Sequence, residues 1–98
     1  MTINKNKNGS KLTLEVEGRL DTTTAPQLDA EVKASISDIT ELEFDFSKLE
    51  YISSAGLRVL LSAQKIMNKQ ESMVIHGASD DLMEIFDVTG FIDILTIE

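Results

Sequence analysis

Two adjacent serines, Ser53 and Ser54, stand where a short apolar pair ends and a strongly apolar run begins, in the stretch YISSAGLRVLL. A serine oxygen can accept a hydrogen bond from a free N–H at the start of a helix, which makes serine a favoured capping residue. A serine can also carry a phosphate, because the free N–H groups and the dipole of a helix N-terminus tolerate that charge. Capping accounts for one of the two serines and leaves the other open to modification.

The residues after the serines add two features to this junction. Ala55 and Gly56 have almost no side chain, so the backbone or nucleotide of a partner could come close. In a helix from about Ser54 to Lys69, Arg58 lies on a narrow polar strip, and apolar residues cover about twice the arc of roughly 100° that a helix on a sheet needs. Either neighbouring helices cover the surplus, or part of it is a partner-binding patch.

The elements that must position the serines alternate between strand and helix patterns. Alternating apolar and polar residues predict half-buried strands, and the turn signal NGS before the second strand predicts a hairpin with a weak edge strand. The predicted strands comprise residues 2–6, 11–20, 41–47, 72–77 and 92–98. The residues expected to face inward are Leu12, Leu14, Val16, Leu42, Phe44 and Phe46.

Three helices are predicted between these strands. The first has capping-box spacing between Thr24 and Gln27, Pro26 in its first turn, and apolar residues every four positions at Leu28, Val32 and Ile36. The second is the helix after the serines, and the third lies within residues 79–90, with Ser79 as its cap and Gly90 at its end. The resulting order, β-β-α-β-α-β-α-β, predicts one α/β domain with a largely parallel sheet.

Two loops stand out because functional loops collect at the carboxyl ends of parallel strands. One comprises residues 21–24 after the second strand, and the other comprises residues 47–54 after the third. The sequence therefore predicts that Asp21 and Ser54 lie at the same end of the sheet.

Composition limits the classes of partner and chemistry. The chain has 98 residues, enough for a single domain, and a formal net charge of −8, which disfavours nucleic acid and anionic membranes and favours a basic protein surface. It contains no cysteine, and no apolar run approaches the roughly 18–20 residues that span a bilayer. We expect a soluble cytoplasmic protein without membrane insertion.

Catalytic and metal-binding interpretations are weaker. A nucleophilic Ser54 would need a base, and nothing in the sequence places the one histidine, His76, beside it. Asp21 and Asp45 supply only one carboxylate per loop, too few ligands for a convincing metal site or phosphoryl-acceptor site. The adjacent pair Asp80 and Asp81 stands at the start of a predicted helix, where acidic side chains stabilise the helix dipole. We therefore expect no enzymatic activity, no cofactor and no metal.

Three stretches of the chain resemble the STAS-domain anti-anti-sigma factors, also called anti-sigma factor antagonists. FDFSKLEYISSAGLRVLL is similar to the serine signature of that family, GRLDTTTAPQL to its Gly-x-Leu-Asp turn, and LMEIFDVTGFIDILTI to its C-terminal helix and strand. The resemblance covers nearly the whole chain as a single STAS domain, residues 1–98. It implies a mixed, mostly parallel five-stranded sheet with helices on one face.

The resemblance also implies a function. It implies that the chain antagonises an anti-sigma factor that is also a serine-protein kinase, with a serine phosphatase of the PP2C type as the opposing enzyme. In that family, the phosphorylated serine stands two residues before the glycine, which makes it Ser54 here. The aspartate of the Gly-x-Leu-Asp turn, Asp21 in this chain, lies near that serine in the family. Where the family often has aspartate, this chain has Ser53, a possible secondary phosphorylation site. The residues expected to bind the partner are Asp21, Thr22, Thr23, Thr24, Ser53, Ser54, Ala55, Gly56 and Arg58.

STAS-like domains also serve as small subunits of membrane transport assemblies, where the partner is an ATPase subunit. The intact serine motif favours the phosphorylation switch over this alternative. The two interpretations differ in the partner that the chain binds.

Overall fold

The computed structural model describes all of residues 1–98 and contains five strands, three α-helices and one 3₁₀-helix. The strands are β1 (Thr2–Asn8), β2 (Lys11–Leu20), β3 (Glu41–Asp45), β4 (Leu49–Ile52) and β5 (Ser72–His76). The helices are α1 (Ala25–Ser35), α2 (Ser54–Met67), α3 (Asp80–Val88) and the 3₁₀-helix η1 (Phe91–Asp93). None of the helices has the combination of length and hydropathy that crossing a membrane requires.

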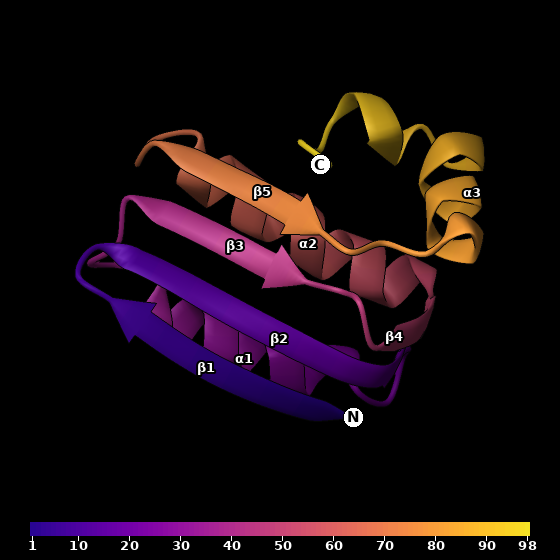
Figure 1. Cartoon of the computed structure of the whole chain (residues 1–98), viewed down its shortest axis with the longest axis horizontal. Helices are drawn as coiled ribbons and strands as arrows, with labels where there is room; N and C mark the ends of the chain where they lie inside the picture. The colour runs from indigo at the N-terminus through magenta and orange to yellow at the C-terminus, as the bar shows by residue number, and fades with distance from the viewer.

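The strands form one mixed sheet in the order β1-β2-β3-β5, with β4 paired to β2 (Figure 1). Only β1 and β2 are antiparallel, as expected for a hairpin. The long strand β2 has two parallel partners in succession: its first half pairs with β3, and residues from Gly18 to Leu20 pair with β4. The register shifts between Gly18 and Arg19, and Gly18 has a φ of 99°, a left-handed backbone that favours glycine.

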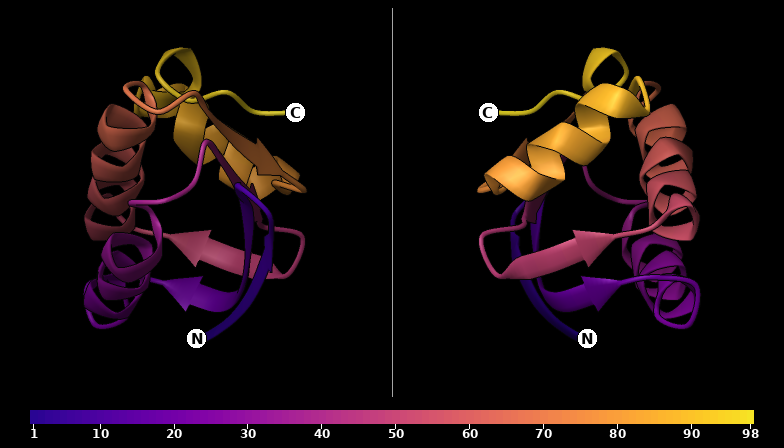
Figure 2. Two further views of the ribbon diagram at one scale, coloured as in Figure 1. Left: turned by 90° about the vertical axis from the view of Figure 1, so that its left-hand side faces the viewer. Right: turned by 90° about the vertical axis from the view of Figure 1, so that its right-hand side faces the viewer.

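Helices α1 and α2 lie side by side on one face of the sheet, as both views in Figure 2 show. Helix α3 packs against β4, at the end of the sheet where the parallel strands finish (Figure 1). This arrangement confirms the predicted fold class, an α/β fold with a mixed, mostly parallel sheet of five strands.

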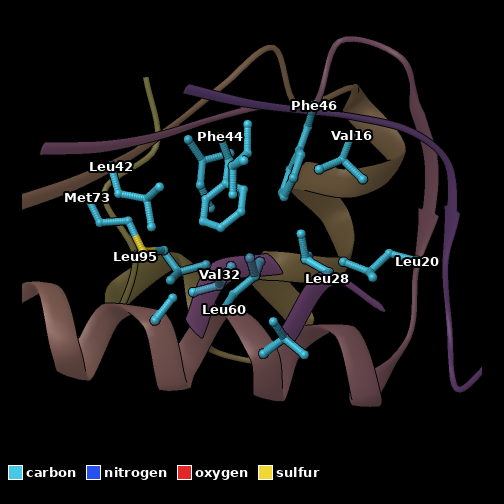
Figure 3. Close-up of a cluster of buried hydrophobic side chains, with 14 of the residues drawn as sticks. Val16, Leu20, Leu28, Val32, Leu42, Phe44, Phe46, Leu60, Met73 and Leu95 are labelled. Atoms are coloured by element: carbon cyan, nitrogen blue, oxygen red, sulfur yellow. The ribbon is translucent and has the colours of Figure 1, made fainter. Parts of the chain in front are cut away.

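The hydrophobic core lies between the sheet and helices α1 and α2. Figure 3 shows Phe44 and Phe46 with Leu28 and Val32 from α1 and Leu60 from α2. The rings of Phe44 and Phe46 are 5.5 Å apart between centroids. All residues predicted to face inward are buried: Leu12, Leu14, Val16, Leu28, Val32, Ile36, Leu42, Phe44 and Phe46.

Two predictions about the strands are wrong. Strand β4 was expected to be loop, because its two buried residues, Leu49 and Ile52, are three positions apart and show no alternation. The expected last strand over residues 92–98 is instead η1 followed by a single parallel bridge between Ile97 and Ile75. Gly90, with a φ of 81°, turns the chain after α3, and the 3₁₀ turn uses the residues that would have formed the strand.

The wide apolar arc of α2 is explained by neighbouring elements. Leu57 and Val59 are buried, Leu61 and Ile66 are half-buried, and α1 contacts α2 along its side. The fully exposed residues of α2 are polar. The surplus apolar surface is therefore part of the fold, which is the first of the two interpretations offered by the sequence.

Gly56 allows α2 to begin close to the ends of β2 and β4. A Cβ atom at this position would lie 2.7 Å from Leu20 Cγ and 2.8 Å from Ile52 Cγ1. These atoms are near the backbone and cannot move aside as freely as the end of a long side chain. The structure thus gives a different reason for the glycine than the approach of a partner: it permits close packing between helix and strands.

We predict that Gly56→Ala lowers the free energy of unfolding. Alanine gains about 1 kcal/mol of helix propensity over glycine, but overpacking costs about 1–3 kcal/mol. An approach of 2.7 Å places the cost in the upper part of that range, about 2–3 kcal/mol, so we expect a net loss of about 1–2 kcal/mol. Urea unfolding measures it. Ser62→Ala, at a half-buried position of the same helix, is the control and should change stability by less than about 0.5 kcal/mol. A Gly56→Ala protein as stable as the wild type would contradict the packing argument.

Candidate functional site

The candidate site lies where β2 and β4 end together. Their parallel register puts Leu20 opposite Ile52, and the Ser53 N–H donates a 2.8 Å hydrogen bond to the Leu20 carbonyl. Asp21 and Ser54 therefore leave neighbouring strands at the same end of the sheet. The structure brings together the two loops that the sequence singled out.

Asp21 folds the first loop into a compact turn. Its Oδ1 accepts hydrogen bonds from the Thr23 hydroxyl (2.7 Å), the Thr23 N–H (3.0 Å) and the Thr24 N–H (3.2 Å). The hydrogen bond from the Thr23 hydroxyl, followed by those from the backbone, holds the pKa of Asp21 below its ordinary value. The carboxylate is thus ionised and fixed, and it presents a rigid turn beside Ser54.

Thr24 does not form the expected capping box with Gln27. Thr24 is the N-cap residue of α1, but its hydroxyl makes no capping bond to the helix. Instead, the Thr24 hydroxyl donates to the Arg19 carbonyl (2.8 Å) and accepts from the Asp21 N–H (2.8 Å). The turn after β2 therefore uses this hydroxyl to fasten itself to the end of the strand.

The two serines occupy different environments. Ser53 is the N-cap residue of α2, with extended backbone (φ −98°, ψ 176°), yet its side chain makes no capping bond. The Ser53 Oγ is buried and has no hydrogen-bond partner. Ser54, the first residue of the helix, is exposed, and its side chain makes no hydrogen bond within the chain. The prediction that a serine occupies the N-cap position of this helix is confirmed by Ser53, but the Ser53 side chain does not form the expected capping hydrogen bond.

The start of α2 presents free backbone donors. The first backbone hydrogen bond of this helix runs from the Leu57 N–H to the Ser53 carbonyl (2.9 Å). The N–H groups of Ser54, Ala55 and Gly56 precede it and point out of the helix end, where the dipole is positive. An anionic group on Ser54 would be placed next to these donors.

A shallow groove of about 390 Å³ runs between α1 and α2. Three residues of the predicted partner-binding set line it: Thr22, Ala55 and Arg58. Arg58 is exposed and makes no ion pair. Thr23 is exposed on the turn, whereas Gly56 faces inward and is buried.

Sequence reasoning missed the α1 side of this groove, lined by Pro26, Asp29 and Lys33, with Asp29 and Lys33 paired at 3.0 Å. It also missed a second turn of the same type after β3, where Asp45 Oδ1 accepts from the N–H (3.0 Å) and hydroxyl (2.7 Å) of Ser47. These bonds, the backbone one first, lower the pKa of Asp45. The shared pattern of Asp followed two residues later by Ser or Thr could have revealed both turns.

The other residues considered for catalysis or metal binding, His76, Asp80 and Asp81, have different neighbours. His76 Nε2 lies 3.5 Å from a Glu43 carboxylate oxygen and 3.9 Å from one of Glu98, and no hydrogen bond joins His76 to Ser54. Asp80 and Asp81 stand in the first turn of α3, behind the cap Ser79, whose hydroxyl accepts from the Leu82 N–H (3.2 Å). No group of three or more His, Asp or Glu side chains is placed to hold a metal ion.

The lowered pKa values predict a pH dependence. Ionised Asp21 and Asp45 stabilise the folded state above the ordinary aspartate pKa of 3.8, and this stability is lost as the pH falls through their lowered pKa values. Asp21→Asn keeps an acceptor oxygen without the charge, so its free energy of unfolding should fall less steeply below pH 3.8 than that of the wild type. Urea unfolding at a series of pH values measures this difference.

The control for this measurement is Glu50→Gln. Glu50 is exposed and makes no hydrogen bond or ion pair, so its variant should reproduce the wild-type profile. Parallel profiles for Asp21→Asn and the wild type would show that the turn does not depend on the charge of Asp21.

Comparison with known proteins assigns the chain to a family. A family model described as "Mlab, STAS domain" matches residues 3–96. The chain is 31% identical to BtrV of Bordetella bronchiseptica over 99% of this chain and 85% of the relative. It is 29% identical to the anti-sigma-B factor antagonist of Listeria monocytogenes over 96% of this chain and 84% of the relative.

Solved structures share the fold. The unphosphorylated form of the anti-sigma factor antagonist SpoIIAA superposes with a TM-score of 0.78 at 14% identity, covering 99% of this chain and 87% of the other. The phosphorylated form of the Bacillus protein gives 0.77 at 15% identity, covering 99% of this chain and 91% of the other. The family model that matches residues 3–96, together with the relative that is 31% identical, shows that the chain belongs to the STAS-domain family of anti-sigma factor antagonists.

Proposed function

We propose that this chain is a phosphorylation-switched anti-sigma factor antagonist and that Ser54 is the phosphorylated residue. The unphosphorylated chain binds an anti-sigma factor that is also a serine-protein kinase, and this binding frees the sigma factor in the cytoplasm. Phosphorylation releases the chain, and a serine phosphatase of the PP2C type restores binding. The observation that carries the proposal is the exposed, unpaired hydroxyl of Ser54 at the N-terminus of α2.

Accessibility favours Ser54 over Ser53 as the acceptor. In the transfer, the Ser54 oxygen forms a bond to the γ-phosphorus of ATP and loses its proton, while the bond to the β-phosphate oxygen breaks and ADP leaves. The attacking oxygen must reach the nucleotide of the kinase. The Ser54 side chain is exposed, whereas the Ser53 oxygen is buried and would have to rotate outward.

The fold can carry the modification without rearranging. A phosphate of about −1.5 to −2 charges on Ser54 lies beside the free N–H groups at the positive end of the α2 dipole. The structures of SpoIIAA in its two phosphorylation states match this fold almost equally, which supports a switch that changes the surface rather than the fold. We therefore infer that the phosphate acts through its charge on the partner's side of the interface.

The proposed contact surface for the kinase joins the turn after β2 to one flank of α2. It comprises Asp21, Thr22, Thr23, Thr24, Ser53, Ser54, Ala55 and Arg58. Ser53 is half-buried and can contribute only through atoms other than Oγ, which is buried. Gly56 is excluded from this surface because its missing side chain is used for packing against Leu20 and Ile52.

Arg58 connects the modification to the interface. It lies four residues after Ser54, one turn along the exposed side of the same helix, and makes no ion pair. In the unphosphorylated state it is free to contact a carboxylate of the partner. A phosphate on Ser54 would compete for this guanidinium, so phosphorylation both adds a negative charge and withdraws a positive one.

We predict that incubation with the cognate kinase and ATP places a phosphate on Ser54. Peptide mass spectrometry should locate it there, and Ser54→Ala should abolish it. Ser53→Ala is the matched control and should remain a substrate, because it removes only a buried hydroxyl that makes no hydrogen bond. A phosphate found mainly on Ser53, or one that persists in Ser54→Ala, would refute the assignment.

We predict that binding to the kinase follows the charge at position 54. Unmodified protein and Ser54→Ala should bind alike, while phosphorylated protein should bind at least about tenfold more weakly, since each 1.4 kcal/mol of unfavourable charge burial is a factor of ten. Ser54→Asp should fall between them. Titration of each form against the kinase measures the affinities, and unchanged circular dichroism spectra would show that the fold is retained. Equal affinities of the phosphorylated and unphosphorylated protein for the kinase would contradict the charge mechanism.

An affinity pull-down from the source cell separates this proposal from the alternative of a transport subunit. The switch predicts recovery of a serine kinase that sequesters a sigma factor, and recovery depends on the state of Ser54. Recovery of the ATPase subunit of a transport assembly, independent of that state, would favour the alternative.

A further inference from the structure

The negative charge of the chain is concentrated in its last third. Residues 70–98 contain seven of the 17 acidic residues and neither Lys nor Arg, so this segment carries −7 of the formal net charge of −8. Of these seven acids only Glu98 is near a basic side chain, with one of its carboxylate oxygens 3.9 Å from His76 Nε2. The six that make no ion pair are Glu71, Asp80, Asp81, Glu84, Asp87 and Asp93.

The same segment carries the three exposed large hydrophobic side chains of the protein. Val88 is 76% exposed, Ile94 is 47% exposed and Ile92 is 37% exposed. They lie within seven consecutive residues, whereas single exposed apolar side chains scattered over a surface would need no explanation. Apolar exposure and unpaired negative charge therefore coincide in one segment of the chain.

Local structure explains why these side chains face outward. Leu82 and Phe86 fill the inner face of α3, which places Glu84 and Val88 on its outer face at 100° per residue. Gly90 then turns the chain into η1, where the Leu95 N–H donates to the Phe91 carbonyl (2.9 Å) and Leu95 is buried. With Leu95 turned inward, Ile92 and Ile94 remain in solvent.

We propose that the surface formed by residues 84–94 is a docking site for a basic, amphipathic segment of a partner protein. Val88, Ile92 and Ile94 provide apolar anchor points, and Glu84, Asp87 and Asp93 supply the negative charge around them. A partner segment with Lys or Arg flanking apolar side chains satisfies both features. Nucleic acid and anionic lipid would meet the same unpaired carboxylates and be repelled.

A second copy of this chain fits the surface poorly. A two-fold contact would bring the same patch against itself and place unpaired carboxylates of both copies together. Three aliphatic side chains also bury far less than the roughly 800 Å² per partner of a stable interface, so the dimer would have little apolar gain to offset the repulsion. The surface instead suits a weaker contact in which opposite charges contribute.

None of residues 84–94 lines the groove near Ser54. Both views in Figure 2 show α1 at one side of α2 and η1 at the opposite side, and the groove lined by Thr22 and Arg58 is on the α1 side. The inference therefore does not rest on the proposed function, and the phosphorylation state of Ser54 should not control it.

The first test uses a synthetic amphipathic helical peptide of Leu and Lys, with a scrambled peptide of the same composition as control. Titrated into the isotope-labelled full chain, the amphipathic peptide should shift the backbone amide signals of residues 84–94 and leave those of residues 21–24 and 53–58 in place. Glu84→Lys/Asp87→Lys should weaken binding at least about tenfold, and Val88→Ser about fivefold. The double variant Asp38→Lys/Glu41→Lys makes the same change in net charge on exposed residues before and at the start of β3, and it should stay within about twofold of the wild type.

The two double variants separate a site from general attraction. Equal weakening in both, equal binding of the scrambled peptide, or shifts spread over the whole surface would overturn the proposal. Ser54→Ala should bind the peptide as the wild type does. Unchanged circular dichroism spectra exclude misfolding as the cause of any loss, and Val88→Ser alters a side chain that is already 76% exposed.

The second test asks whether the site is occupied in the source cell. A photo-crosslinking amino acid at position 88 should join the chain to a partner segment that is rich in Lys or Arg, and the same amino acid at the exposed position 41, at the start of β3, should not. Mass spectrometry identifies the sequence of the crosslinked partner peptide and therefore its content of Lys and Arg. Crosslinks only to further copies of this chain, only to acidic or neutral segments, or to no protein at all would contradict the inference.

Discussion

The parallel pairing of β4 with the end of β2 is the constraint on which the rest of the site depends. Leu20 and Ile52 are paired in the parallel register, and the Ser53 N–H donates a hydrogen bond to the Leu20 carbonyl. Strands β2 and β4 therefore end next to each other, and the segments that follow them start from the same place. The turn of Asp21 and the first turn of α2 are therefore neighbours. Gly56 completes the arrangement, since any side chain there would push the start of α2 away from Leu20 and Ile52.

The sequence predicts this framework only in part, and the reason is physical. Strands β2 and β3 alternate buried and half-buried or exposed residues, so a period of two reveals them. Strand β4 has four residues, of which only Leu49 and Ile52 are buried, and a spacing of three carries no strand signal. The segment after Gly90 shows the opposite error, since its apolar residues predict a strand that the structure does not contain. The turn at Gly90 and the buried position of Leu95 instead accompany a 3₁₀-helix.

The site shows the same division between local and non-local information. Asp21 and Ser54 can be assigned to one end of the sheet because each follows a predicted strand, and parallel strands share their carboxyl end. The groove between α1 and α2 cannot be foreseen, because it depends on how two helices pack across the sheet. The difference between Ser53 and Ser54 likewise depends on which of the two oxygens the fold buries, and only the folded chain shows that it is the one of Ser53.

Charge divides the molecule in a way that bears on how a phosphate would be sensed. Residues 1–69 contain nine basic and ten acidic residues, a formal charge of −1, whereas residues 70–98 carry −7. A phosphate of about −1.5 to −2 charges on Ser54 would therefore more than double the negative charge of the nearly balanced part and barely alter that of the acidic part. Since exposed charges are screened beyond about 10 Å at moderate salt, the phosphate acts mainly on groups near Ser54. A partner in the groove between α1 and α2 would sense the phosphate strongly, and one held through η1, on the opposite side of α2, would sense it less, so the two surfaces are suited to a regulated and a constant contact.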